Sequence, residues 1–279
     1  MRYLDLKEVT SAVYHLAIDA CYDINEEILD SLKTYRKKEE STLGKIVIDK
    51  IIENDILARN EKMPICQDTG LTVVFLEIGN NVHFKGDIYQ AVNEGVRNAY
   101  IDGYLRKSVV IHPFHRINTM DNTPAIIHTK IVMGDHLKIT VAPKGGGSEN
   151  VSLVKMLIPA DGIEGVKKLV LDTIFEAGGK PCPPIIVGLG IGGNLEKAAL
   201  LAKEALMRDL NDQNSDEMVA KLEKELLEEI NRLGIGPMGF GGRTTALAVK
   251  INTYPCHIAS LPVAINIQCH AARHKSIIL

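Results

Sequence analysis

Three cysteines that lie far apart in the chain constrain its fold most strongly, because each sits in a segment rich in polar and turn-forming residues. They are Cys66 in PICQDTG, Cys182 in GGKPCPP and Cys269 in NIQCH. Three thiolates can hold a metal cluster and leave one coordination position open for a substrate, as at catalytic rather than structural metal sites. The alternative is burial of each thiol as a small apolar side chain, which we expect of Cys21 and Cys256. The polar flanks of the other three favour metal ligation.

The composition bounds the class of protein. With 279 residues, of which 46% are hydrophobic and 24% charged, the chain can bury a sizeable core as an ordinary soluble globular protein. No segment approaches about 18 uninterrupted apolar residues, and the start of the chain lacks the apolar region of a signal peptide, so we expect a cytoplasmic protein with no membrane partner. An odd number of cysteines fits a reducing compartment. A net charge of −3 and the absence of Trp argue against a nucleic-acid partner.

Hydrophobic periodicity predicts a mixed α+β fold, in which helices pack on a sheet that contains antiparallel strands and the N-terminal region is helical. The predicted helices lie within 1–60 and at 87–106, 162–177, 194–210 and 215–232, and the predicted strands are 72–78, 125–133, 136–142, 185–189, 245–254 and 258–267. The strands that flank Gly134-Asp135 are predicted to form a hairpin. Since no interdomain linker is evident, we expect one catalytic domain over residues 1–279.

Two glycine-rich segments are typical of ligand contact. Residues 188–193 (GLGIGG) match the dinucleotide-binding pattern, but 195–232 predict helices where that fold needs a second parallel strand ending in an acid. We therefore expect these glycines to let the backbone approach a cluster or substrate, just before a helix N-terminus. Gly145, Gly146 and Gly147 follow a predicted strand and can hold a carboxylate with backbone N–H groups. A plain surface turn is the alternative for this second segment.

Basic residues near these motifs suit an anionic substrate, because a guanidinium binds a carboxylate through two hydrogen bonds. Arg106, Arg116, Arg243 and Arg273 all fall in predicted loops, where each can equally be an ordinary solvated side chain. Among the histidines we favour His257, which precedes a predicted strand, as catalytic.

The chain resembles the iron–sulfur hydro-lyases, class I fumarase and L-tartrate dehydratase, and in particular the α chain of the two-subunit forms. The motifs that carry the resemblance span almost the entire chain in the family order, and they are PICQDTG, RKSVV at 106–110, RINTMDNTPA at 116–125, KGGGSEN, GLGIGGN, GGRTTALAVK and LPVAINIQCHAARH. The resemblance implies that Cys66, Cys182 and Cys269 hold a [4Fe–4S] cluster whose fourth iron takes the substrate.

The resemblance also implies roles for single residues. Gln67 and Asp68 match residues that contact the substrate, and Asp68 is the candidate for proton transfer. Arg106 matches a carboxylate-binding arginine, and the glycines at 145–147 match a substrate-contacting turn. His257 matches a histidine that enters the site from a neighbouring copy of the chain.

The expected activity is the reversible hydration of fumarate to L-malate, with L-tartrate dehydration as the alternative. Single-chain relatives carry a further C-terminal domain, so we expect a separate β subunit here and a heterotetramer built on a homodimer of this chain. The alternative from another class is a non-catalytic scaffold subunit, whose cluster would need a fourth protein ligand. Only His270, which stands where many bacterial relatives carry a bulky aromatic residue, adjoins a cysteine ligand closely enough in sequence to serve.

Overall fold

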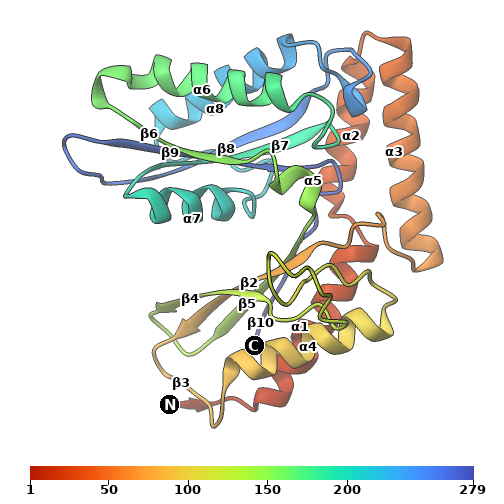
Figure 1. The fold of residues 1–279 in the computed structure, drawn as a ribbon, viewed down its shortest axis with the longest axis vertical. Helices are drawn as coiled ribbons and strands as arrows, with labels where there is room; N and C mark the ends of the chain where they lie inside the picture. The colour runs from red at the N-terminus through yellow and green to blue at the C-terminus, as the bar shows by residue number, and fades with distance from the viewer. The chain divides into compact units, whose positions relative to one another are not determined.

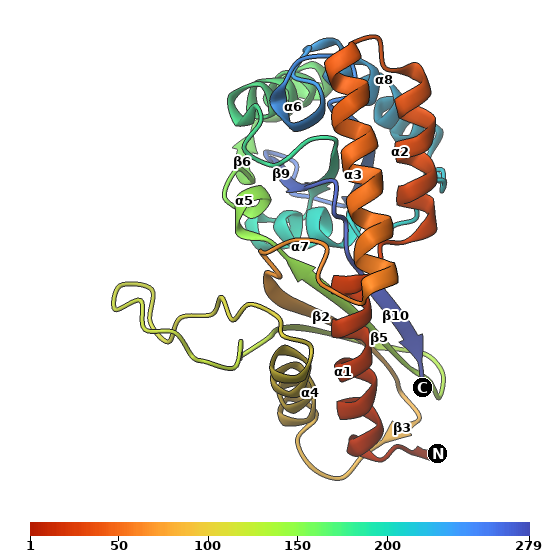
Figure 2. The same ribbon diagram turned by 90° about the vertical axis from the view of Figure 1, so that its right-hand side faces the viewer.

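The computed structural model describes residues 1–279 and divides into two compact units (Figures 1 and 2). The first unit comprises Met1–Asn25, Asp55–Gly146 and Arg273–Leu279, and the second comprises Glu26–Asn54 and Gly147–Ala272. Each unit is assembled from separate stretches of the chain, which explains why the sequence contains no evident linker. That the whole chain acts as one catalytic domain stays a prediction.

The first unit contains a four-stranded sheet with helices on one face (Figure 1). Its elements are β1 (Arg2–Tyr3), α1 (Leu6–Tyr22), β2 (Leu71–Gly79), β3 (Val82–His83), α4 (Ile88–Asp102), β4 (Ile126–Val132), β5 (Leu137–Lys144) and β10 (Lys275–Ile278). The strand order is β10-β5-β2-β4, in which β2 and β4 run parallel and the other neighbours antiparallel. The short strands β1 and β3 form a separate parallel pair.

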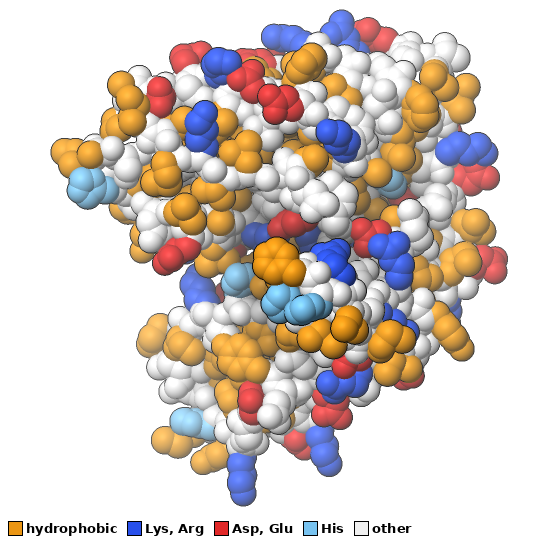
Figure 3. All heavy atoms as spheres, in the orientation of Figure 1, with side chains coloured by type: hydrophobic (Ala, Val, Ile, Leu, Met, Phe, Trp, Pro, Cys, Tyr) orange, Lys and Arg blue, Asp and Glu red, His pale blue; other side chains and the backbone are white.

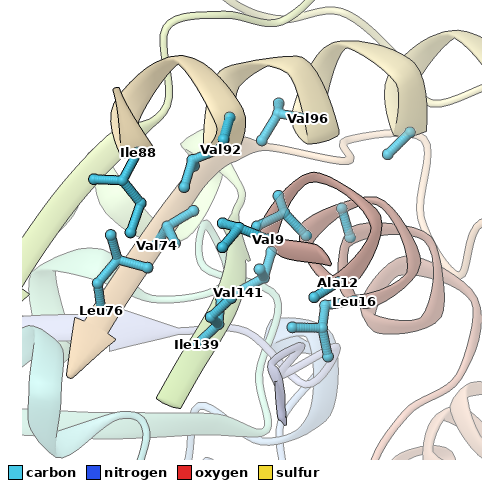
Figure 4. Packing of buried hydrophobic residues seen from close by; sticks show 14 of the residues in the cluster. Val9, Ala12, Leu16, Val74, Leu76, Ile88, Val92, Val96, Ile139 and Val141 are labelled. Carbon is cyan, nitrogen blue, oxygen red and sulfur yellow. The ribbon is translucent and has the colours of Figure 1, made fainter. Parts of the chain in front are cut away.

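The core of the first unit forms where α1 and α4 face the sheet (Figure 4). Val9 and Leu16 of α1 pack with Val92 of α4, and these helices cover Val74 of β2 and Ile139 of β5. All five side chains are buried, and their helical and alternating spacing is the periodicity that predicted these elements. The central strands of this sheet are therefore fixed by apolar packing, and they carry the loops described below.

The predicted hairpin between β4 and β5 is wrong, because β2 lies between the two strands. The connection from β4 to β5 instead passes around the end of β2. There the N–H of Gly134 donates to Asn80 Oδ1 at 2.9 Å, and the N–H of Asn81 donates to the Gly134 carbonyl at 2.9 Å. Gly134-Asp135 is thus a turn, as predicted, but the strands on either side of it pair with a third strand rather than with each other.

The second unit is a four-stranded sheet of order β6-β9-β7-β8, with helices on both faces. Its elements are α2 (Glu26–Lys38), most of α3 (Thr42–Glu61), α5 (Gly146–Glu149), β6 (Leu153–Leu157), α6 (Gly162–Ala177), β7 (Ile185–Gly192), α7 (Leu195–Ala205), α8 (Glu217–Arg232), β8 (Ala246–Tyr254) and β9 (Leu261–Gln268), with short 3-10 turns at Pro159–Asp161 and Pro237–Gly239. Figure 1 shows α6 and α8 on one face and α7 on the other. Only β7 and β8 pair in parallel.

The glycines at 188–192 lie in strand β7 and not in a ligand loop, which corrects the prediction for this segment. They permit α7 to lie directly on the sheet. A Cβ atom at Gly190 would lie 2.0 Å from the Ala198 carbonyl oxygen of α7, and one at Gly188 would lie 2.3 Å from that of Ala202. The glycine pattern is therefore explained by helix–sheet packing, without a bound dinucleotide.

Most of the other predicted elements are confirmed. The helical N-terminal region is formed by α1, α2 and α3, and the predicted helices and strands of the second half occur with shifted ends. The sequence did not predict the short strands β1, β3, β6 and β10, nor the helical turn α5 that replaces the expected open loop at KGGGSEN. None of the helices combines the length and the hydrophobicity needed to span a lipid bilayer.

Candidate active site

The loop Cys66–Gly70, between α3 and β2, places the Asp68 side chain among several donors of the first unit. Asp68 Oδ2 accepts the N–H of Gly146 at 2.8 Å, and Asp68 Oδ1 accepts the N–H of Gly70 at 3.1 Å. The Arg106 guanidinium lies 3.7 Å from Oδ1, and Arg273 Nη2 donates to the Asp68 backbone carbonyl at 2.8 Å. The Asp68 carboxylate is thus held by two backbone N–H groups with Arg106 nearby, while Arg273 holds the backbone of the same residue.

Buried polar groups fix the position of this loop. The hydroxyl of Tyr100 donates to the carbonyls of Thr69 at 2.8 Å and Gly70 at 3.2 Å, and burial raises the pKa of Tyr100 so that it stays a donor. The fully buried Asn122 donates to the Gly70 carbonyl at 3.2 Å. Gly70 itself has φ +75°, and a Cβ there would lie 2.5 Å from the backbone of Lys144, so only glycine fits.

Asn122 and Thr69 also connect the Arg106 segment to this loop. Asn122 Oδ1 accepts the N–H of Ser108 at 2.7 Å, and the Thr69 hydroxyl donates to the Arg106 carbonyl at 2.9 Å. The Arg106 side chain remains 58% exposed, whereas that of Asp68 is 25% exposed. Arg106 is therefore anchored through its backbone while its guanidinium is accessible to a second anion.

Cys66 and Gln67 lie at the start of the same loop. The N–H of Asp68 donates to Cys66 Sγ at 3.4 Å, and Cys66 Sγ lies 3.6 Å from Gln67 Oε1. Cys66 is partly exposed and Gln67 is exposed. The structure thus brings together four of the predicted residues, Cys66, Gln67, Asp68 and Arg106, on one side of the first unit.

The predicted glycine run is divided between the two units. Gly145 and Gly146 belong to the first unit and Gly147 to the second. The carboxylate that the Gly146 N–H holds is that of Asp68, and a Cβ at Gly145 would lie 3.1 Å from Asp68 Oδ2. Gly147 lies in α5, where a Cβ would lie 3.5 Å from the Lys180 carbonyl oxygen. A role for these glycines in substrate contact stays a prediction.

Cys182 and Cys269 lie in adjacent loops of the second unit. Cys269 follows β9 directly, and the N–H of His270 donates to the Cys182 carbonyl at 3.3 Å. Cys182 has φ +56°, an uncommon conformation for a residue with a side chain, and its N–H donates to Gly179 at 3.1 Å. A tight turn therefore holds Cys182 next to the Cys269 loop.

His257 lies at the opposite end of strand β9 from Cys269. It is exposed in the turn between β8 and β9, where its Nδ1 accepts the N–H of Ala259 at 3.1 Å. The eight residues of β9, at about 3.3 Å each, separate His257 from Cys269 by roughly 25 Å. Within one chain these two residues cannot serve the same reaction centre.

Arg273 is the residue of this site that sequence reasoning did not select. It was one of four arginines named without a choice among them, and the structure buries it to 2% exposure against the Asp68 backbone. Its position four residues after Cys269, inside the motif LPVAINIQCHAARH, was the available signal. Arg116 and Arg243 do not contact Asp68; Arg243 Nε instead lies 3.3 Å from Glu40.

The remaining cysteines differ from one another. Cys21 is fully buried as predicted, and burial raises its pKa to about 11, despite a smaller opposing effect of Arg273. A thiol of this kind stays protonated and is a poor metal ligand. Cys256 is exposed, so the prediction that it is buried is wrong. The difference arises because Cys256 lies in the turn after β8, beyond the apolar part of that strand.

The three cysteines predicted as ligands fit an iron–sulfur cluster in their chemistry. Cys66, Cys182 and Cys269 are all partly exposed thiols in loops, outside any disulfide, and Cys66 Sγ already accepts an N–H bond of the kind that stabilises thiolate ligands. Cys66 belongs to the first unit and the other two to the second. The side chains form no group of three or more His, Cys, Asp or Glu that could hold a metal ion. The ligand assignment therefore stays a prediction.

Comparisons with known proteins extend over nearly the whole chain. The family model described as fumarate hydratase (fumerase) matches residues 10–278. A Methanocaldococcus jannaschii protein, provisionally named L(+)-tartrate dehydratase subunit alpha, is 46% identical over 273 residues, which cover 95% of each chain. The L(+)-tartrate dehydratase subunit alpha of Escherichia coli O157:H7 is 32% identical over 258 residues, 91% of this chain and 85% of its own. The protein of the same name from E. coli K12 has the same identity and coverage.

Proposed function

Because this chain belongs to the fumarate hydratase family of hydro-lyases, we propose that it is the cluster-bearing α subunit of an enzyme that adds or removes water at a four-carbon dicarboxylate. The observation that carries the proposal is the hold on Asp68, whose carboxylate accepts the N–H groups of Gly70 and Gly146 and lies 3.7 Å from Arg106. This residue stands two positions after a candidate ligand, Cys66. This arrangement combines a proton-transfer group with an exposed cationic partner for an anionic substrate.

The proposed cofactor is a [4Fe–4S] cluster bound by Cys66, Cys182 and Cys269. When bound, it would supply a Lewis-acidic iron that stabilises the hydroxide lost from the substrate carbon. Three protein ligands suit this chemistry, since a fourth would close the position that the substrate needs. Cys21 is left out of the proposed ligand set because it is fully buried in the apolar core of the first unit.

Asp68 is the proposed group for moving the proton. Dehydration removes a proton from the carbon next to a carboxylate and expels hydroxide from the adjacent carbon. The hydrogen bonds from Gly70 and Gly146 orient the Asp68 carboxylate, so that it can accept or return this proton without rotating. Groups of this kind typically contribute about 10²–10⁴-fold to the rate.

Arg106 is the proposed partner of the substrate carboxylate. Its guanidinium is exposed and contacts Asp68 only at 3.7 Å, so it can form two hydrogen bonds with a substrate. Arg273 has a different role, because it is buried against the Asp68 backbone and holds the loop. Gln67, exposed beside Cys66, and the glycines at 145–147 are the further proposed substrate contacts.

His257 is proposed to act in the site of a neighbouring copy of the chain. The support is its distance from Cys269, roughly 25 Å along β9, which is too far for a shared reaction centre within one chain. The names of the relatives, subunit alpha, support a separate β subunit, and the assembly we propose is a heterotetramer on an α-chain dimer.

The second-copy role has a direct test in mixed assemblies. His257→Asn and Asp68→Asn should each impair turnover with cluster content near normal. Mixing the two variants should restore part of the activity, because one site of a mixed dimer then contains both native residues. If demonstrably mixed dimers recover no activity, His257 does not act in the site of a neighbouring copy.

The substrate is either L(+)-tartrate, as the names of the relatives support, or fumarate and L-malate, as the family description supports. The α and β chains should be purified together without oxygen and assayed for loss of water from L(+)-tartrate and from L-malate. Turnover of one of them by the complex, and little turnover by the α chain alone, is expected. A fully loaded complex that is inactive on both would overturn the proposal in favour of a non-catalytic cluster-binding subunit.

A further inference from the structure

A hairpin arm projects from the first unit. It carries basic residues as well as hydrophobic side chains that are exposed to solvent. We define the arm as residues 106–120, which connect α4 to β4; Figure 2 shows them projecting away from both elements. It is an ordered hairpin: the N–H of Ile111 donates to the Ile117 carbonyl at 2.7 Å, and that of Thr119 donates to Val109 at 3.0 Å. Its base is fixed by the buried Asn122.

The outer side chains of the arm are unusually apolar for solvent. Phe114 is 87% exposed, Ile111 69% and Ile117 63%. Figure 3 shows hydrophobic and histidine side chains gathered over the part of this face from which the arm projects. The arm also carries Arg106, Lys107 and Arg116 but no acidic residue. A hydrogen-bonded hairpin with such a tip is typical of a segment that inserts into a partner.

The second unit contains a groove of complementary character. It lies between α6, α8 and the turn from β8 to β9, and it has a volume of about 430 Å³. A cavity of about 150 Å³ is known to accept benzene, so this groove has room for an aromatic side chain and an aliphatic neighbour. Its floor includes the buried Val166, Val219 and Leu222, and its rim includes Met218 and Ile258, which are 66% and 92% exposed.

The ends of the helices beside the groove are acidic. Asp161 and Glu164 lie at the start of α6, and Asp216 and Glu217 lie at the start of α8, all with exposed side chains. Two nearby lysines are paired with the same acidic residue, since Lys167 lies 2.6 Å and Lys221 lies 3.6 Å from Glu225. The groove thus has an apolar floor and acidic residues at its border. The arm has an apolar tip and basic residues, so the two surfaces are complementary in both respects.

We propose that the arm of one copy of this chain docks into this groove on a second copy. The occupant is a second copy because both complementary surfaces occur on the same chain, so a two-fold pair forms two equivalent contacts. The groove wall also contains His257, while the base of the arm carries Arg106 beside Asp68. Docking would bring His257 of one copy toward the Asp68 loop of the other, and only this last consequence rests on the proposed function.

A cross-linking experiment tests the contact itself. The groove already contains the exposed Cys256, so a thiol introduced by Phe114→Cys should form a disulfide with it between differently tagged copies of the full chain under mild oxidation. The link should disappear with Cys256→Ser. The matched control is Met133→Cys, an equally exposed apolar residue at 88% in the turn between β4 and β5, which should give no link to Cys256.

A second measurement follows self-association directly. Phe114→Asp should raise the dissociation constant of the self-associated chain by at least about 30-fold in sedimentation, as expected for a central aromatic contact, whereas Met133→Asp should leave it unchanged. A link confined to one chain, or no link in folded protein, would overturn the proposal. So would a Phe114→Asp chain that self-associates normally but loses its β subunit or its affinity for lipid vesicles, since the arm would then serve that partner. Neither readout depends on turnover, so the proposed reaction can fail while the contact holds.

Discussion

Glu39 provides the sharpest test of how the second unit is stabilised. It is 2% exposed in the turn between α2 and α3, where its carboxylate joins that turn to the segment before β8. Oε1 accepts the N–H groups of Ser41 at 2.9 Å and Arg243 at 3.0 Å, and Oε2 accepts that of Thr244 at 2.7 Å. A Glu39→Gln substitution replaces one acceptor oxygen by an NH₂ group that faces backbone donors.

The magnitude follows from the pKa of Glu39. Burial alone would raise this pKa, but the hydrogen bonds from Thr244, Arg243 and Ser41 outweigh it and lower the pKa from 4.5 to about 2. A difference of about 2.5 units, at about 1.36 kcal/mol each, corresponds to about 3 kcal/mol of stability for the ionised form. Since the folded pKa is the lower one, this contribution is complete above about pH 4.5 and is lost as the pH falls toward 2.

Urea unfolding followed by circular dichroism measures the effect. Glu39→Gln should lose about 3 kcal/mol at pH 7, and its difference from the native chain should narrow between pH 4.5 and 2. Hydrogen exchange of the Arg243 and Thr244 amides should accelerate by about two orders of magnitude. The control is Glu40→Gln, whose side chain is 73% exposed and pairs only loosely with Arg243, at a cost below about 1 kcal/mol. Equal behaviour of the two variants, or a difference that persists at pH 2, would refute the reasoning.

Three further predictions concern packing and the candidate active site. Gly190→Ala should destabilise the protein by about 1–3 kcal/mol in thermal unfolding, because its Cβ would lie 2.0 Å from a carbonyl oxygen of α7. Arg106→Lys should raise KM and lower kcat of the complex while the iron content stays normal, since an ammonium group cannot form the planar two-bond fork; native kinetics would make Arg106 an ordinary surface residue. Cys66→Ser should lose the cluster in iron analysis and EPR, whereas Cys21→Ser should retain it; the opposite pattern would overturn the ligand assignment.

Local patterns predicted the helices well because each helix carries its own apolar face. The spacing of Val9, Val13 and Leu16 already specifies how α1 packs, whatever its neighbours are. Strand order is different, because it depends on partners far away in the sequence. The turn at Gly134-Asp135 was visible, but nothing local indicated that β2 would enter between β4 and β5.

Short edge strands and close-packed glycines were missed for the same reason. The strand β10 pairs through four residues with β5, more than 130 positions earlier in the chain, and its sequence alone is too short to reveal periodicity. The sequence around Gly188 and Gly190 predicted a ligand-binding loop. A glycine that permits close approach of a ligand cannot be distinguished in sequence from one that permits close approach of a helix. Only the position of α7 distinguishes the two.

At the candidate active site, the resemblance indicated Asp68 and Arg106, which the structure brings together, but not how the donors around Asp68 compete for its carboxylate. The Gly146 N–H and the Arg106 guanidinium both approach the Asp68 carboxylate, one at 2.8 Å and the other at 3.7 Å. An incoming substrate carboxylate is the stronger attraction for Arg106, because it offers two oxygens in the geometry of the guanidinium fork. Arg106 would then leave Asp68 Oδ1, while Gly146 keeps Oδ2 in place. Under the proposed function, substrate binding would thereby withdraw Arg106 from the oxygen that accepts the proton, which keeps the N–H of Gly70 as its donor at 3.1 Å. Recognition by Arg106 and proton transfer by Asp68 would then be linked through one shared contact.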